Sequence, residues 1–301
     1  MVQSSVLGFP RIGAQRELKK VTEAYWSKKV SVEELLAKGK EIRAHNWKLQ
    51  KDAGVDVIAS NDFSFYDQVL DLSLLFNVIP DRYTKFGLEP IDVLFAMGRG
   101  LQRKATETEA AVDVTALEMV KWFDSNYHYV RPTFSNTTEF KLNNGAGLKP
   151  VKEFLEAKEF GVGTRPVVLG PISYLYLGKV DKDSLDLDPI SLLDKFLPVY
   201  KSLLAELYKA GAKTVQIDEP ILVLDLPQSV QDLYQSTFQQ LVGEGLPEIT
   251  LTTYFGDVRP NLAALKGLPV KGFHFDFTRA PAQFDDVLAI VGDNQTFSVG
   301  V

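Results

Sequence analysis

Glycine repeatedly separates a helical stretch from a short apolar run in this chain. One helical pattern ends at Gly54, and the apolar run at 55–59 begins at once. The same order recurs at three later glycines, Gly211, Gly267 and Gly292. Glycine readily adopts the left-handed backbone conformation that ends a helix. Helices that alternate with short apolar runs predict an α/β fold with a parallel sheet and right-handed crossovers.

Eight apolar runs are candidate strands, at 6–7, 55–59, 129–130, 166–169, 214–217, 249–252, 272–275 and 296–299. Eight strands and the length of 301 residues predict a (βα)8 TIM-type barrel with extra N-terminal helices, since such barrels take about 250 residues. A doubly wound open sheet is the alternative, but its glycine-rich phosphate loop is missing after the first run. The last run, 295–301, has no helix after it. We therefore expect residues 1–301 to be a single barrel truncated at its eighth strand, a piece of a longer protein.

The helix before Gly54 has a clear start. Ser31 and Glu34 have the spacing of a capping box, in which each side chain bonds the other residue's backbone amide. Leu35, Ile42 and Leu49 follow at intervals of seven and are predicted to share one buried face.

Composition restricts the class of protein. Hydrophobic residues make up 45% and charged residues 24%, as in a soluble globular protein. The net charge of −6 argues against nucleic acid or a membrane surface as partner. There is no cysteine, no secretory leader, and no apolar run near the ~18 residues of a membrane span. A cytoplasmic protein without disulfides or thiolate metal ligands is expected.

A basic stretch near the N-terminus contrasts with the acidic whole. Between positions 11 and 29 there are six basic and two acidic residues, a local charge of +4. Arg16 and Lys19 are three apart and lie on one side of a predicted helix, where they could bind successive carboxylates of an extended anion. The alternative is a solvated charged face, which is what most charge runs are.

Polar residues follow the predicted strands, where barrel proteins bind ligands. They are Ser60, Asn61, Asp62, Pro132, Thr133, 170–173, 218–220, Thr253, Tyr254 and Asp276. Asp218 and Glu219 form the sharpest acidic pair, but adjacent strand residues face opposite sides, so an ion pair or a hydrogen bond to a loop is the favoured interpretation. His274 and Asp276 share a face, and with Asp218 they suggest a metal-dependent hydrolase or decarboxylase as a weaker alternative. A helix is predicted to end at 121–123, and an aromatic patch follows it at 126–129. Lys121 at the end of this helix and Asn126 at the start of the patch could hydrogen-bond a heteroaromatic or carboxylate ligand.

Six motifs in order carry a resemblance to a known family: residues 7–11, 16–20, 122–129, 169–171, 215–220 and 251–255. Together they resemble the N-terminal half of cobalamin-independent methionine synthase. That family is a two-barrel, zinc-dependent methyltransferase that moves a methyl group from 5-methyltetrahydrofolate polyglutamate to homocysteine. The zinc ligands of the family lie in its C-terminal catalytic barrel, which this chain lacks.

The resemblance implies that this half binds the folate polyglutamate tail and supports the catalytic barrel. The implied contacts with the folate are Arg16, Glu17, Leu18, Lys19, Lys121 and Asn126. No catalytic residue and no metal ligand is expected in this chain, which alone should be inactive. The expected partners are the folate and the C-terminal barrel of the same protein, and a monomer is expected. A free-standing anion-binding barrel is the alternative function.

Overall fold

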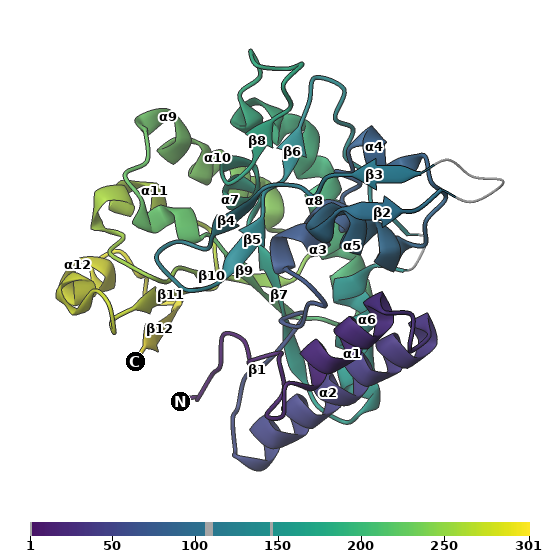
Figure 1. Cartoon of the computed structure of the whole chain (residues 1–301). Coiled ribbons are helices and arrows are strands. Elements are labelled where there is room, and N and C mark those ends of the chain that lie inside the picture. The colour runs from purple at the N-terminus through teal and green to yellow at the C-terminus, as the bar shows by residue number, and fades with distance from the viewer. Residues whose placement is uncertain (1, 106–110, 145–146) are drawn as a thin grey trace.

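A six-stranded parallel sheet organises the chain (Figure 1). The computed structural model describes residues 2–105, 111–144 and 147–301. The strand order is β1-β7-β9-β10-β11-β12. The strands are β1 (Ile58–Ser60), β7 (Thr164–Leu169), β9 (Thr214–Asp218), β10 (Glu248–Thr252), β11 (Gly272–Asp276) and β12 (Thr296–Gly300). A parallel bridge between Ser5 and Val57 adds the N-terminal segment beside the start of β1.

The predicted parallel α/β fold is confirmed, with two corrections at residues 119–130 and one difference in the closure of the sheet. The run at 129–130 is wrong as a strand of the main sheet, because it lies in β5 (His128–Val130), which pairs antiparallel with β4 (Met119–Lys121). The helix expected to end at 121–123 is wrong for the same reason. Within the described residues the sheet is also open, with β12 at one edge, so they do not form a closed eight-stranded barrel.

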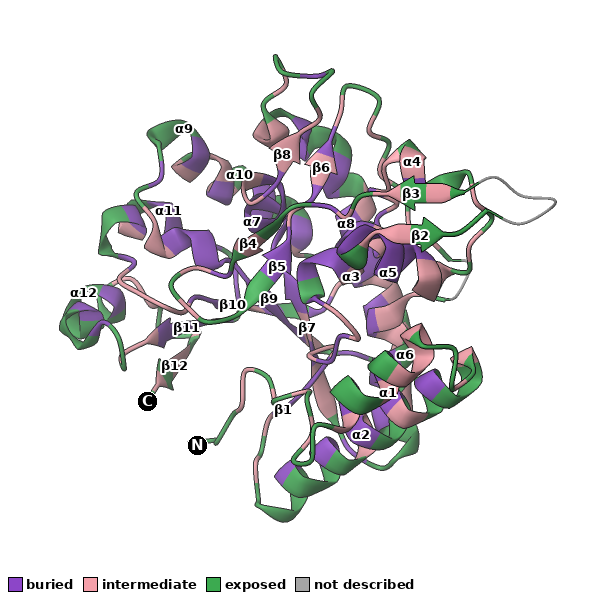
Figure 2. Ribbon diagram, viewed as in Figure 1, coloured by how far each residue is buried: buried purple, intermediate pink, exposed green. Residues whose placement is uncertain are grey.

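Helices cover the outer face of the sheet and enclose the main core. The largest buried cluster joins the strands to α8 (Leu193–Ala210) and α10 (Leu233–Leu241) through side chains such as Phe196, Tyr200, Leu204 and Phe238. Figure 2 shows buried residues along the strands and on the helices that pack against them. The helices of this layer are α6 (Lys149–Glu159), α7 (Pro171–Tyr176), α8, α9 (Gln228–Gln231), α10, α11 (Leu262–Leu265) and α12 (Phe284–Leu288).

A second, smaller core lies beside the first. It is built on α3 (Gln68–Leu75) and α5 (Pro90–Arg99), and it includes Leu70, Tyr83, Phe95 and Met97. Its helices are these two and α4 (Asp81–Thr84). Two short strand pairs contribute side chains to it, β4–β5 and β2 (Leu101–Arg103) with β3 (Val112–Val114). A third pair, β6 (Thr133–Phe134) with β8 (Lys179–Val180), contributes Phe134 to the main core.

Two N-terminal helices, α1 (Glu17–Trp26) and α2 (Val32–Asp52), lie beside each other before the first strand (Figure 1). The capping box at Ser31 and Glu34 is confirmed, and Gly54 follows the helix with φ of 78°. Leu35 and Ile42 are buried as predicted, but Leu49 is 49% exposed. A straight helix drifts by about 20° per heptad, so a strict seven-residue spacing leaves the buried face, and Trp47 and Gln50 take the place predicted for Leu49.

No helix in the described part of the chain has the length and apolar character of a membrane span.

Candidate functional site

The carboxyl ends of the parallel strands bring most of the predicted polar residues to one edge of the sheet. Backbone hydrogen bonds join neighbouring ends: Gly170 N–H to Asp218 O at 2.7 Å, Glu219 N–H to Thr252 O at 2.9 Å, and Thr253 N–H to His274 O at 3.0 Å. Pro132 and Thr133 are exceptions, because Thr133 lies in β6, which pairs with β8 outside this sheet, and the Pro132 carbonyl accepts from Lys179 N–H of β8.

Asp218 and Glu219 point to different surroundings, as the strand geometry predicts. The carboxylate of Asp218 accepts hydrogen bonds from Gln216 Nε2 at 2.8 Å and from the Tyr254 hydroxyl at 3.2 Å. Burial raises the pKa of Asp218 to about 7, although Gln216, Tyr254 and Arg165 favour its charged form. Asp218 also lines a cavity of about 30 Å³, with Asn61, Gln68, Asp71 and Lys149 among the other walls. Such a cavity can hold a small number of water molecules.

Glu219 caps a helix. Its carboxylate accepts hydrogen bonds from Ile172 N–H at 3.2 Å and Ser173 N–H at 2.9 Å, at the start of α7. It also accepts from the Ser173 hydroxyl at 2.6 Å and the Tyr234 hydroxyl at 3.2 Å. The side chain is fully buried, and burial raises its pKa to about 7. The sequence favoured an ion pair or a hydrogen bond to a neighbouring loop. Asp218 makes such a bond with Tyr254 in the loop after β10, whereas the partners of Glu219 lie in helices.

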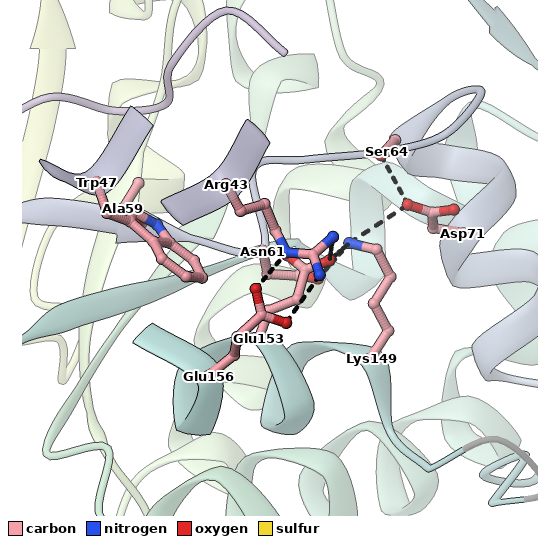
Figure 3. A network of polar contacts seen from close by, with 9 residues as sticks. All are labelled: Arg43, Trp47, Ala59, Asn61, Ser64, Asp71, Lys149, Glu153 and Glu156. Atoms are coloured by element: carbon pink, nitrogen blue, oxygen red, sulfur yellow. Dashed lines mark hydrogen bonds and ion pairs between the residues drawn. The ribbon is translucent and has the colours of Figure 1, made fainter. Parts of the chain in front are cut away.

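A largely buried ion network shares Asn61, Asp71 and Lys149 with the walls of this cavity, and Figure 3 shows its contacts. Arg43 of α2 donates to both carboxylate oxygens of Glu156, at 3.0 and 2.8 Å, and lies 3.7 Å from Glu153. Lys149 Nζ lies 3.2 Å from Glu153, 3.4 Å from Asp71, and 2.8 Å from Asn61 Oδ1. The network ties α2, α6, α3 and the end of β1 together.

Sequence reasoning missed this network. The four-residue spacing of Lys149 and Glu153 is the signal that could have shown one contact. Arg43 and Glu156 are 113 positions apart, and no local pattern links them.

The basic N-terminal stretch lies at the carboxyl end of β1. Phe9 N–H donates to Asp62 Oδ2 at 2.7 Å, and Arg11 donates to the Tyr66 carbonyl at 2.5 Å. Burial raises the pKa of Asp62 to about 6, against the lowering effect of the Phe9 amide. The stretch is therefore attached to the same edge of the sheet as Asp218.

The four predicted ligand contacts in this stretch differ in their surroundings. Arg16 is exposed with φ of 60°, and it forms no ion pair or side-chain hydrogen bond with any described residue. Lys19 is exposed and lies 3.8 Å from Glu23. Leu18 is buried and packs with Ile42 and Phe63. Glu17 accepts from Gln15 N–H at 2.9 Å, and hydrogen bonds to backbone amides lower its pKa. The first turn of α1 is thus already occupied in part by a carboxylate of the chain.

Lys121 and Asn126 lie on the β4–β5 hairpin, and both side chains are exposed. Neither forms a side-chain hydrogen bond or ion pair with another described residue. The tip of the hairpin contacts the loops after β10 and β11, because Phe123 packs on Phe255 and Asp124 pairs with Arg279. The hairpin and the basic stretch therefore lie at the same edge of the sheet but over different strands. Their roles in ligand binding stay a prediction.

The weaker alternative, a metal-dependent hydrolase or decarboxylase that uses Asp218, His274 and Asp276, would need a group of metal ligands. Among residues 2–105, 111–144 and 147–301, no three His, Cys, Asp or Glu side chains are placed to hold a metal ion. His274 Nδ1 lies 2.8 Å from the Ser298 hydroxyl, and burial lowers the pKa of His274 to about 4. Asp276 is engaged with backbone amides of the loops beside it.

The raised pKa of Asp218 predicts a pH effect on stability. A carboxyl of pKa about 3.9 when unfolded and about 7 when folded favours the native state most at low pH. That contribution is lost as the pH rises from about 4 to about 7. Between pH 4.5 and 8, the free energy of unfolding of the wild type should therefore fall by about 2–4 kcal/mol relative to that of Asp218→Asn. Urea unfolding at each pH measures this difference.

Asp257 gives the control for this measurement. The Arg259 guanidinium holds the pKa of Asp257 below its usual range, so Asp257→Asn should shift stability equally across pH 5 to 8. A difference between wild type and Asp218→Asn that stays constant with pH would contradict the prediction.

Comparison with known proteins decides the family. The model of the family described as "Cobalamin-independent synthase, N-terminal domain" matches residues 3–301. The chain belongs to this family. The resemblance predicted from the six motifs is thus confirmed.

Individual relatives of the cobalamin-independent synthase family agree. The chain is 75% identical over 301 residues to the 5-methyltetrahydropteroyltriglutamate–homocysteine methyltransferase of Candida albicans, and 70% identical over 303 residues to that of Saccharomyces cerevisiae. Both alignments cover 100% of this chain and 39% of the relative. The chain therefore spans well under half the length of these proteins.

Solved structures agree in fold. A putative vitamin-B12 independent methionine synthase from Listeria monocytogenes aligns with a TM-score of 0.61 at 16% identity, covering 99% of this chain and 78% of that one. A B12-independent methionine synthase from Shewanella sp. W3-18-1 aligns with a TM-score of 0.56 at 16% identity, covering 90% and 72%. At this identity the likeness concerns the fold alone.

Proposed function

We propose that the chain is the folate-tail-binding part of a methyltransferase that transfers a methyl group from 5-methyltetrahydropteroyltriglutamate to homocysteine to make methionine. The observation that carries this proposal is the identity of 75% and 70%, over the whole chain, to relatives that bear the name of this activity. Because the chain spans 39% of their length, the parent would have a further part that performs the reaction.

The chemistry of the basic stretch supports the assignment of tail binding. A γ-glutamyl tail carries several carboxylates, and Arg16 and Lys19 offer exposed cations at the start of one helix. A forked guanidinium and a point-charge ammonium both suit carboxylates. Leu18 is buried between them and would fix the helix, while Glu17 would orient its first turn through the Gln15 amide. Binding energy from such a remote tail can position a methyl donor for reaction.

Lys121 and Asn126 would make the second set of contacts with the folate. Their hairpin reaches the ends of β10 and β11, whereas the basic stretch lies at β1. β1 and β10 are three strand spacings apart in the sheet, about 14 Å along its surface. About four extended residues cover that span, so one extended ligand can reach both regions.

We propose that the chemistry belongs to the part of the parent outside this chain. A metal activates a thiol substrate by lowering the pKa of the thiol, which favours the reactive thiolate. The family resemblance implies zinc for that task. The chain itself would contribute binding and support, with no catalytic residue of its own. We also propose that its sheet forms part of a closed (βα)8 barrel in the parent, a closure supported by the uniform parallel pairing.

Tail length tests the proposal directly. Triglutamyl and monoglutamyl 5-methyltetrahydrofolate are titrated into the chain by calorimetry. We expect the triglutamyl form to bind at least tenfold more tightly, since each tenfold corresponds to about 1.4 kcal/mol, the size of one or two charge-assisted contacts. The double variant Arg16→Ala, Lys19→Ala should remove most of this preference and leave the monoglutamyl affinity nearly unchanged.

Lys28→Ala, Lys29→Ala is the matched control, because it removes the same charge from the region just after α1. It should preserve the preference for the triglutamyl form. Equal affinity of wild type for the two folates, or no binding of either, would overturn the proposal. A free-standing anion-binding module would instead bind a general polyanion as tightly as it binds the triglutamyl folate.

A further inference from the structure

The tip of the β4–β5 hairpin carries an unusual backbone conformation that is matched by its contact partner. Phe123 and Phe255 have φ of 53° and 74°. Positive φ is a genuine outlier for a bulky side chain, and it persists only where the surroundings hold it. The two rings contact each other with centroids 5.8 Å apart. Phe123 lies between Lys121 and Asn126 in sequence, so the constrained contact lies within the segment proposed to bind folate.

Asp276 at the end of β11 fixes the two loops that the hairpin tip contacts. We call these loops the platform; they are the loop after β10, which contains Phe255, and the loop after β11, which contains Thr278 and Arg279. Asp276 Oδ2 accepts from Phe255 N–H at 3.0 Å. Its Oδ1 accepts from Thr278 N–H at 3.0 Å and from Arg279 N–H at 3.1 Å. One carboxylate therefore joins the loop after β10 to the loop after β11, and it sets the backbone positions of both Phe255 and Arg279.

Arg279 connects that platform to the hairpin. Its guanidinium forms an ion pair and a hydrogen bond with Asp124, the residue after Phe123. The same guanidinium lies over the ring of Phe255, 5.4 Å from its centroid. Phe255 and Arg279 on the platform thus hold Phe123 and Asp124 on the tip.

The rest of the hairpin is anchored separately. Trp122 is buried and packs on Tyr129 with ring centroids 5.4 Å apart. The Arg279 and Asp124 side chains are 41% and 66% exposed, and exposed ion pairs contribute little to global stability. Their contact therefore governs the orientation of the tip more than the stability of the fold.

We propose that Arg279 and Asp276 are positioning residues, which hold the hairpin tip so that Lys121 and Asn126 present a fixed binding surface. This inference rests on the proposed function for the role of the two hairpin side chains. The ligand class is the same, a folate with a polyanionic tail, and neither Arg279 nor Asp276 needs to touch it.

Two measurements on the chain test the inference. Hydrogen exchange of the hairpin amides at 122–127, without ligand, reports on the tip directly, and calorimetry with triglutamyl 5-methyltetrahydrofolate reports on binding. Arg279→Ala and Asp124→Ala are expected to speed exchange at the tip at least threefold and to weaken binding threefold to tenfold. Arg279→Lys keeps the charge and should restore most of both. The double variant should resemble either single one, because the two side chains act through one contact.

Arg259→Ala is the matched control. Arg259 pairs with Asp257 at 2.6 Å in the same loop region and is 43% exposed, similar to Arg279. It should leave tip exchange and binding unchanged, and the midpoint of thermal unfolding should change little in any of these variants. Unchanged exchange at the tip in Arg279→Ala, or faster exchange with wild-type affinity, would overturn the positioning role. Failure of wild type to prefer the triglutamyl folate would overturn the proposed function instead, and the exchange result would still decide whether Arg279 holds the tip.

Discussion

Replacing Glu219 with alanine is expected to lower the free energy of unfolding by about 3–5 kcal/mol, because buried hydrogen-bond donors lose their acceptor and each such group costs about 1–3 kcal/mol. The carboxylate is the acceptor for two backbone amides and a hydroxyl at the start of α7, and for the Tyr234 hydroxyl. All of these donors are buried, so the variant leaves them without a partner. Urea unfolding at pH 7 measures the loss.

Two further variants isolate the cap from other effects. Glu248→Ala removes a carboxylate that is 57% exposed at the start of β10 and should cost less than about 1 kcal/mol. Gly170→Ala tests the same contact from the other side, because an added Cβ would lie 2.0 Å from Glu219 Oε1. It should destabilise the fold by about 1–3 kcal/mol through overpacking. A loss below 1 kcal/mol for Glu219→Ala would contradict the capping role.

Replacing Arg43 with methionine is expected to lower the free energy of unfolding by a similar amount, about 3–5 kcal/mol. Arg43 is 11% exposed and bonds Glu156 through two nitrogens, while Glu153 lies beside it at 6% exposure (Figure 3). Methionine fills much of the same volume but leaves Glu156 without its main donor. The loss of attachment between α2 and α6 should also appear as faster hydrogen exchange in both helices.

Lys48→Met is the control on the same helix. Lys48 pairs with Asp52 at 2.6 Å, but both side chains are about 60% exposed. This variant should change the free energy of unfolding by less than about 1 kcal/mol. If Arg43→Met cost no more than Lys48→Met, the buried network would not be the contact that joins the two helices.

Local patterns predicted the elements of the sheet well. The runs that became β1, β7 and β9 to β12 are short, apolar and preceded by a helix stop or turn, and those features depend on neighbouring residues only. The run at 129–130 has the same apolar character but joins an antiparallel hairpin, since its partner is β4 rather than a strand of the sheet. Strand character is a local property, whereas the choice of partner strand is not.

The candidate site likewise combines features that follow from the local sequence with contacts that only the tertiary structure sets. Strand ends placed Asn61, Asp218 and Asp276 at one edge, because parallel strands all finish there. The sequence by itself determined the capping box at Ser31, the helix stop at Gly54, the basic stretch around Arg16 and the family. Only the tertiary structure decided that Glu219 caps α7, that Arg43 pairs with Glu156, and that Arg279 holds Asp124. These partners are 46, 113 and 155 positions apart. Helical and strand periodicities reach only a few residues, so contacts over such separations are set by how the elements fold together.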